Sequence, residues 1–194
     1  MSDNTEQVKV TEKTVERLPL MWAVVITVWF SLPFGTFFGN WNFTLWVSFI
    51  VWAQYFVLGA NFQTWKLIFP SIPYGAGIGV LWCSAAVLVD NIFRFSLQGF
   101  WGLMLMTPIF ISTFIYLIPK VKAWQNGSLA VFNGYTMFLA VYFSGSLPQA
   151  GPMDNPYWVI IFSFIWTIAM CLFGWFLGWL NVTLTFPKKV KVNE

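Results

Sequence analysis

Six apolar runs divide the chain, and segments rich in polar residues, glycine or proline separate most of them. An α-helix needs roughly 20 apolar residues to cross about 30 Å of hydrocarbon. The stretch 73–118 is too long for one helix, and its polar residues Asp90, Asn91, Arg94 and Gln98 predict a tight turn within it. The pattern predicts an all-α integral membrane protein with six transmembrane helices, at residues 18–38, 43–60, 73–89, 100–118, 128–147 and 157–180.

These spans divide the chain into a polar N-terminal tail (1–17), a six-helix transmembrane domain (18–180) and a basic C-terminal tail (181–194). The connection at 61–73 has two interpretations. We favour a simple one, in which Trp65 and Lys66 mark a helix end anchored at the cytoplasmic surface. In the other, the apolar residues 67–69 belong to a segment that re-enters the membrane.

The basic residues predict the orientation. With the N-terminus inside, the inner segments contain nine of the ten lysines and arginines, and the outer turns contain only Arg94. Cytoplasmic segments of membrane proteins carry such an excess. Both termini are therefore predicted to be cytoplasmic, since an odd number of spans would place one basic tail outside.

Short features recur in the two halves of the predicted domain. Pro33 and Pro108 each lie inside the first helix of a half, and Pro73-Tyr74 and Pro156-Tyr157 each open the third. A unit of three helices, if duplicated, is inverted in the membrane. A 3+3 inverted repeat is one interpretation, and chance similarity among abundant aromatic residues is the other.

Two glycine pairs predict close helix packing, because small residues four apart let helix backbones approach. Gly75 and Gly79 open the third span, whereas Gly174 and Gly178 close the sixth. We expect these contacts within the subunit or between copies. In the predicted orientation both pairs lie in the cytoplasmic leaflet, which argues against close symmetry of the halves.

Composition supports the membrane location and narrows the chemistry. The chain is 58% hydrophobic and 9% charged, whereas soluble domains carry about 25% charged residues. It has 2 cysteines and no histidine, the commonest general base and metal ligand. We therefore predict that the protein is not an enzyme and has no catalytic residues, metal or cofactor. The small net charge of +3 predicts that it does not bind nucleic acid.

Polar side chains within the second and fifth predicted helices suggest a solute path. Gln54 stands among apolar residues, and Asn133 and Ser144 share one line of the fifth helix with Thr136 about 60° away. If the two helices face each other, Gln54 and Asn133 lie at similar depth, and their amides could replace water around a small neutral solute. The aromatic residues predicted to narrow this path are Trp52, Tyr55, Tyr135 and Tyr142.

Each of these features has a second interpretation. Gln54 and Asn133 could instead hold helices together, at roughly 1 kcal/mol or less for each bond. Asp90 and Arg94, spaced as a helical i, i+4 pair, either mark the outer end of the third helix, which we favour, or form a charged gate at the outer mouth. The scarcity of carboxylates within the spans argues against proton-coupled transport and is compatible with a passive channel.

The motif Trp52-Ala53-x-Tyr55-Phe56-x-x-Gly59, followed by Lys66 and the glycine-rich start of the third span, resembles the YcdZ-like family of small bacterial inner-membrane proteins. The resemblance covers about residues 18–180. It implies a multi-pass six-helix bundle in the bacterial inner membrane and supplies no substrate. Size and aromatic content also look like those of the urea and short-amide channel family, although this chain lacks the histidines and acidic loops of a pH-gated version.

Taken together, these patterns predict a small channel or facilitator for a small neutral solute. It would lie in the lipid bilayer as a homo-oligomer or with membrane partner subunits. The second hypothesis is a non-catalytic accessory subunit of a larger membrane complex, in which the amides hold helices together and the aromatic side chains face a partner.

Overall fold

The computed structural model describes residues 10–36, 42–93, 100–186 and 188–193. Each of the six predicted apolar runs is helical, as expected. The main helices are α1 Leu20–Thr36, α2 Leu45–Val57, α3 Trp65–Phe93, α4 Phe100–Leu117, α6 Ser128–Ser144 and α7 Pro156–Thr185. The short elements are β1 Val10–Val15, η2 Phe62–Thr64, η3 Ile118–Lys120, α5 Lys122–Gln125 and β2 Lys188–Asn193.

Three helical segments among the described residues are long and apolar enough to cross a membrane: Phe62–Phe93, Trp101–Lys120 and Pro156–Thr185. The apolar helices α1, α2 and α6 are shorter, with 17, 13 and 17 residues. At 1.5 Å per residue α2 is roughly 20 Å long, and α3 and α7 are roughly 44 Å long. Length and composition of the three long segments therefore indicate a membrane protein.

α3 differs most from its predicted bounds, because it begins at Trp65 instead of residue 73. Pro70 and Pro73 predict an interruption, since proline lacks an N–H and clashes with the preceding turn. The helix nevertheless continues through both prolines, with Ile68 and Ile72 buried in the core. Packing against neighbouring helices therefore outweighs the lost backbone hydrogen bonds.

Most of the predicted connection at 61–73 is therefore helical, since α3 includes residues 65–73. α2 ends at Val57, the chain turns at Gly59 and Ala60, which both have positive φ, and Trp65 and Lys66 start a helix instead of ending one. The predicted turn between the third and fourth spans lies largely outside the described residues, since α3 continues to Phe93.

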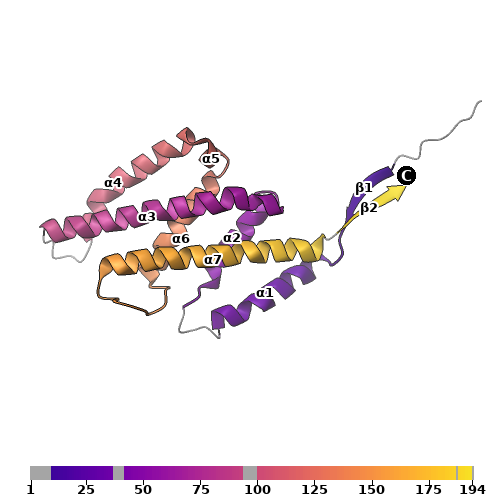
Figure 1. The fold of residues 1–194 in the computed structure, drawn as a ribbon, viewed down its shortest axis with the longest axis horizontal. Coiled ribbons are helices and arrows are strands. Elements are labelled where there is room, and N and C mark those ends of the chain that lie inside the picture. Colours follow the sequence, from indigo (N-terminus) through magenta and orange to yellow (C-terminus); the bar gives the residue numbers. More distant parts are fainter. Residues whose placement is uncertain (1–9, 37–41, 94–99, 187, 194) are drawn as a thin grey trace, which may run out of the picture.

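α3 and α7 form the centre of the bundle, side by side and antiparallel (Figure 1). α6 and α4 pack on α3, whereas α2 and α1 pack on α7. Half a turn about the viewing axis of Figure 1 exchanges α1 with α4, α2 with α6 and α3 with α7. The two halves of the helix bundle are thus related by a pseudo-two-fold axis.

The glycine pair of α3 packs directly on α6. A Cβ atom added to Gly75 would lie 1.9 Å from the backbone oxygen of Val131, and one added to Gly79 would lie 2.4 Å from the ring of Phe138. Only glycine permits this approach of the two helices.

The glycine pair of α7 makes the equivalent contacts with α2. A Cβ atom on Gly174 would lie 2.2 Å from the backbone oxygen of Ser48, and one on Gly178 would lie 2.8 Å from Tyr55. Ser48 and Tyr55 are seven residues apart, as are the two residues contacted on α6. All four glycines are therefore covered within the subunit, and the early start of α3 brings its pair nearer the middle of the helix than the sequence predicts.

Apolar side chains fill the interior in two clusters. One joins α2, α3, α6 and α7 around Tyr55, Ile72 and Met137, and the other joins α3, α4, α6 and α7 around Trp82, Phe114 and Phe138. The bundle interior is thus packed by side chains from both halves.

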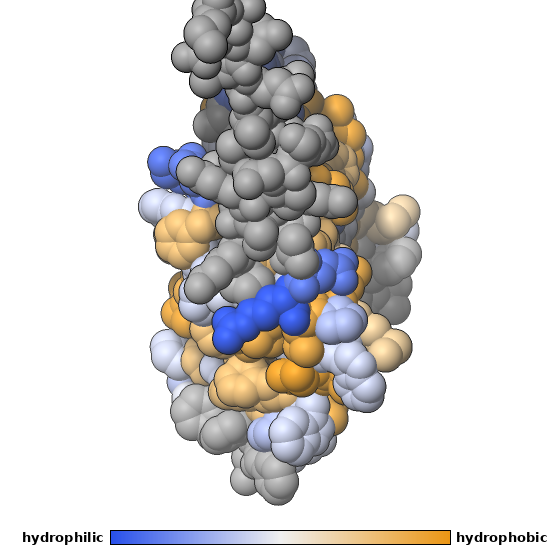
Figure 2. All heavy atoms as spheres, turned by 90° about the vertical axis from the view of Figure 1, so that its right-hand side faces the viewer, coloured by the Kyte–Doolittle hydropathy of each residue, from blue (hydrophilic) through white to orange (hydrophobic). Residues whose placement is uncertain are grey.

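The two tails form one antiparallel ribbon instead of separate segments. β1 pairs with β2 from Val10 opposite Asn193 to Val15 opposite Lys188, and α7 extends to Thr185, beyond its predicted end. The ribbon projects from the adjacent ends of α1 and α7 (Figure 1). Viewed from that end, the molecule shows a small group of hydrophilic residues with hydrophobic ones around them (Figure 2). The all-α prediction therefore holds for the described residues between these two strands.

Candidate functional site

The structure brings Gln54 of α2 and Asn133 of α6 together. Asn133 Nδ2 donates a hydrogen bond to Gln54 Oε1 at 3.0 Å. The Gln54 side chain is 2% exposed, and Asn133 is partly buried. This amide pair joins the middle helices of the two halves, although α2 packs mainly on α7 and α6 mainly on α3.

One end of the amide pair has unused hydrogen-bonding capacity. Gln54 Nε2 is buried and has no partner among the described residues. Three more buried groups have no partner among the described residues: Nε1 of Trp52, the hydroxyl of Tyr135 and Nε1 of Trp82. Trp52 and Tyr135 are among the predicted lining residues. Buried polar atoms without a partner are rare in folded proteins and call for an explanation such as bound water or a ligand.

The predicted polar line of α6 does not continue inward from Asn133. Thr136 and Ser144 are exposed on the outside of the bundle. The Thr136 hydroxyl donates to the Phe132 carbonyl at 3.0 Å, and the Ser144 hydroxyl donates to the Ala140 carbonyl at 2.5 Å. Both hydroxyls are thus satisfied by their own helix.

The four predicted aromatic lining residues lie in different parts of the core. Tyr55 packs on Gly178 of α7, whereas Tyr135 lies 5.3 Å from Phe114 of α4 between ring centroids. Trp52 contacts Phe49 of its own helix. That these residues narrow a solute path stays a prediction.

Tyr142 stacks on Phe138 within α6, with ring centroids 6.1 Å apart. Unlike the other three aromatic residues, it is only partly buried. Its contacts place it in the cluster shared with α3 and α4, away from α2.

Asp90, one of the two residues of the possible charged gate, links the end of α3 to the start of α4. Its Oδ1 accepts a hydrogen bond from the backbone N–H of Gly102 at 2.9 Å, and its Oδ2 has no partner among the described residues. A carboxylate that faces the first turn of a helix, as Asp90 faces α4, is favourable because the N–H groups there are unpaired. Arg94, its predicted partner, lies outside the described residues.

Sequence reasoning missed a second buried polar contact between helices. Asn181 of α7 is fully buried, and its Nδ2 lies 3.4 Å from Thr27 Oγ1 of α1. The predicted sixth span ends at residue 180, which assigns Asn181 to the tail. The apolar residues that follow Asn181, at 182 and 184, are the signal that would have extended the span.

Three cavities lie away from the amide pair. One of about 230 Å³ is a groove between α3 and α7, one of about 560 Å³ lies along α1, and one of about 410 Å³ lies beside η2. None of these three is lined by Gln54 or Asn133. The amide pair thus lies outside these three cavities, with Gln54 buried and Asn133 half-buried.

Metal ligands are not grouped in the part of the chain that the structure describes: it contains no cluster of three His, Cys, Asp or Glu side chains able to hold an ion. Cys83 and Cys171 are buried free thiols. No protein-family model matches the chain, nor does any curated protein or solved structure. The resemblance to the YcdZ-like family stays a prediction.

Proposed function

We propose that the protein crosses a bacterial inner membrane six times, with both tails in the cytoplasm and its two halves inverted. The pseudo-two-fold arrangement supports this, as do the ribbon that holds both tails together and the nine of ten basic residues that this orientation places inside. α1, α2 and α6 are shorter than the hydrocarbon thickness. Their flanking residues and a locally thinned bilayer would compensate, while the longer α3 and α7 would tilt.

Within this arrangement the protein acts as a channel or facilitator for a small neutral solute, and the amide pair closes it. The observation that carries this proposal is the Gln54–Asn133 bond between the two halves, with Gln54 Nε2 left without an acceptor. In transporters built from inverted repeats, the substrate site lies near the midplane where the repeats meet.

The chemistry of the amides suits a neutral solute. Each amide both donates and accepts hydrogen bonds. A solute that does the same can therefore replace Asn133 as the partner of Gln54, and Gln54 as the partner of Asn133. One such bond between membrane helices contributes only about 0.6 kcal/mol on average, so its exchange costs little. An ion would lack a compensating charge in this apolar interior.

We further propose association with copies of the chain or with membrane partner subunits through the exposed apolar faces. Trp29 of α1, at 75% exposure, is the most exposed of the large hydrophobic side chains described. The glycine pairs are not available for such contacts, because α2 and α6 already cover them.

A second candidate function is that of an accessory subunit in a larger membrane complex. The direct contact of the two amides and the packed interior favour it, because a pure structural bond needs no solute. In that case Gln54 and Asn133 only hold α2 and α6 together.

Solute flux separates the two candidates. The purified chain is reconstituted in liposomes, and stopped-flow shrinkage is followed with urea, formamide, glycerol and water. A channel accelerates the flux of at least one solute, and Gln54→Leu and Asn133→Leu reduce it. Thr136→Val is the matched control, since this hydroxyl faces outward and the change should leave the flux unaltered. A folded wild type without flux for every solute rules out the channel and leaves the accessory role.

A further inference from the structure

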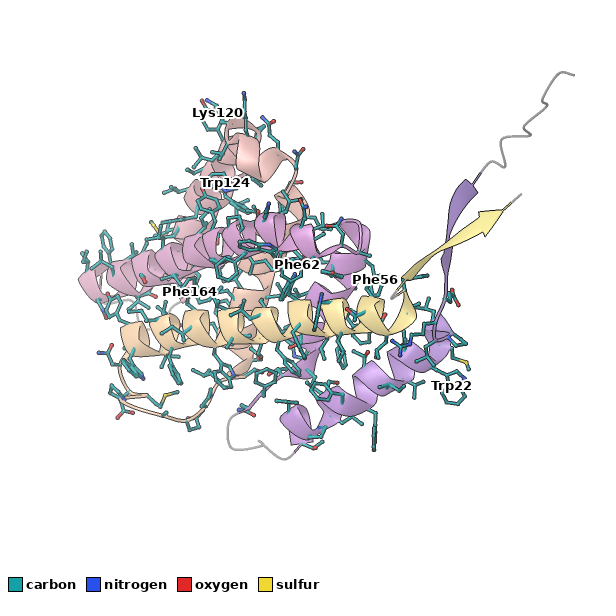
Figure 3. All side chains as sticks on the ribbon, turned by 45° about the vertical axis from the view of Figure 1, so that its right-hand side comes forward. Trp22, Phe56, Phe62, Lys120, Trp124 and Phe164 are labelled. Carbon is teal, nitrogen blue, oxygen red and sulfur yellow. The ribbon has the colours of Figure 1, made fainter. Side chains whose placement is uncertain are left out.

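We propose that the groove between α3 and α7 holds an acyl chain of an anionic phospholipid whose headgroup pairs with Lys66. The groove has a volume of about 230 Å³. Its principal walls are Phe62 of η2, Trp65 and Phe69 at the start of α3, and Ile168, Leu172 and Trp175 on α7. Phe62 lies between these two helices in Figure 3.

The groove requires an apolar occupant. The residues that line it are almost all apolar, and an apolar cavity of roughly 150 Å³ stays dry and accepts an apolar guest. Along α3 it extends from Trp65 to Pro73, which is roughly 12 Å at the rise of an α-helix. It therefore runs along the helix axis, the direction in which an acyl chain enters the bilayer.

The charge at one end of the groove selects the headgroup. Lys66 directly follows the groove residue Trp65 and stands three residues before the groove residue Phe69, so it lies at this end of the groove on the same helix. Its side chain is exposed and forms no ion pair with a described residue.

The aromatic residues fix the depth of this end. Tryptophan and lysine side chains together favour the headgroup region, with the apolar part in hydrocarbon and the charge in water. Trp65 and Lys66 thus place the Trp65 end of the groove at the membrane surface and its Pro73 end in the hydrocarbon. The proposal rests on the membrane location given above and is independent of solute flux.

Lipid binding is measured on the full chain by native mass spectrometry in detergent, with phosphatidylglycerol and phosphatidylcholine titrated separately. One phosphatidylglycerol should bind in preference to phosphatidylcholine. Lys66→Gln should reduce this preference about fivefold, the effect of one basic residue near an anionic headgroup. Leu172→Trp should weaken the binding of both lipids, because the larger ring fills the groove.

Ile161→Trp is the matched control: Ile161 is an exposed apolar residue of α7 outside the groove walls, and its replacement should leave both lipids unaffected. Equal binding of the two lipids to the wild type would overturn the proposal, as would an unchanged preference in the folded Lys66→Gln variant. If the wild type shows no solute flux but still prefers phosphatidylglycerol in a way that depends on Lys66, the channel proposal fails and the lipid proposal stands.

Discussion

Gln54 is the residue whose environment says most about this protein. An amide buried in an apolar interior without a partner costs several kcal/mol, roughly 2 to 7 depending on the reference state. Asn133 donates to the side-chain oxygen of Gln54, whereas the side-chain nitrogen of Gln54 has no acceptor among the described residues. One end of the Gln54 amide is thus bonded between the helices, and the other end has unused hydrogen-bonding capacity.

The strength of the amide pair can be measured with a double-mutant cycle. We expect Gln54→Leu and Asn133→Leu to be coupled by about 0.6 kcal/mol and by at most about 1.7 kcal/mol, the range found for hydrogen bonds between membrane helices. The free energy of unfolding in mixed micelles of sodium dodecyl sulfate provides the measurement. Gln54→Leu combined with Thr136→Val should show no coupling, and equal coupling in both cycles would contradict the contact.

The contacts between helices depend on backbone proximity. Gly75 meets a carbonyl of α6, and Gly174 meets a carbonyl of α2. In lipid no hydrophobic force drives helices together, so close van der Waals packing at small residues supplies much of the association. The four glycines therefore hold the long central helices to the short ones in both halves.

Two glycines of α3, two residues apart, test this explanation. We expect Gly75→Ala to destabilise the fold by about 3 kcal/mol, at the upper end of the range for overpacking, because its Cβ would lie 1.9 Å from a backbone oxygen of α6. Gly77→Ala should be neutral or stabilising by up to about 1 kcal/mol, since nothing lies within 4 Å of its Cβ and alanine favours the helix. Thermal unfolding of the detergent-solubilised variants measures both, and equal losses would contradict the packing.

At the scale of the whole molecule, two halves of the helix bundle are related by a pseudo-two-fold axis, and a two-stranded ribbon joins the tails. The backbone N–H of Arg17 donates to the Thr185 carbonyl at 2.8 Å, next to the β1–β2 pairing. The first and last helices are therefore joined at one end, as a protein with both termini on one side of a membrane allows.

A disulfide tests the ribbon. Thr14 stands opposite Lys189 in the register, and paired strands bring such Cα atoms within about 5.5 Å, a suitable distance for a disulfide. We expect Thr14→Cys with Lys189→Cys to cross-link under mild oxidation, seen as a mobility shift on a non-reducing gel. Thr14→Cys with Lys188→Cys is the control, because Lys188 stands opposite Val15. Comparable cross-linking of both pairs would show that the register is not fixed.

The sequence by itself determined the membrane class, the approximate positions of six apolar helices and the two glycine pairs. Length and apolar composition suffice for this, because a segment that must satisfy its backbone in hydrocarbon forms a helix almost regardless of its side chains. The same reasoning singled out Gln54 and Asn133, since amides are costly and therefore conspicuous in an apolar run.

Only the tertiary structure decided which faces of the helices meet. It turned Thr136 and Ser144 outward, separated Tyr55 from Tyr135, and carried α3 through Pro70. In a soluble helix the polar face marks the outside, whereas in a bilayer the lipid-facing side is as apolar as the core. The hydrophobic pattern therefore locates a membrane helix without giving its rotation, and packing between helices sets that rotation.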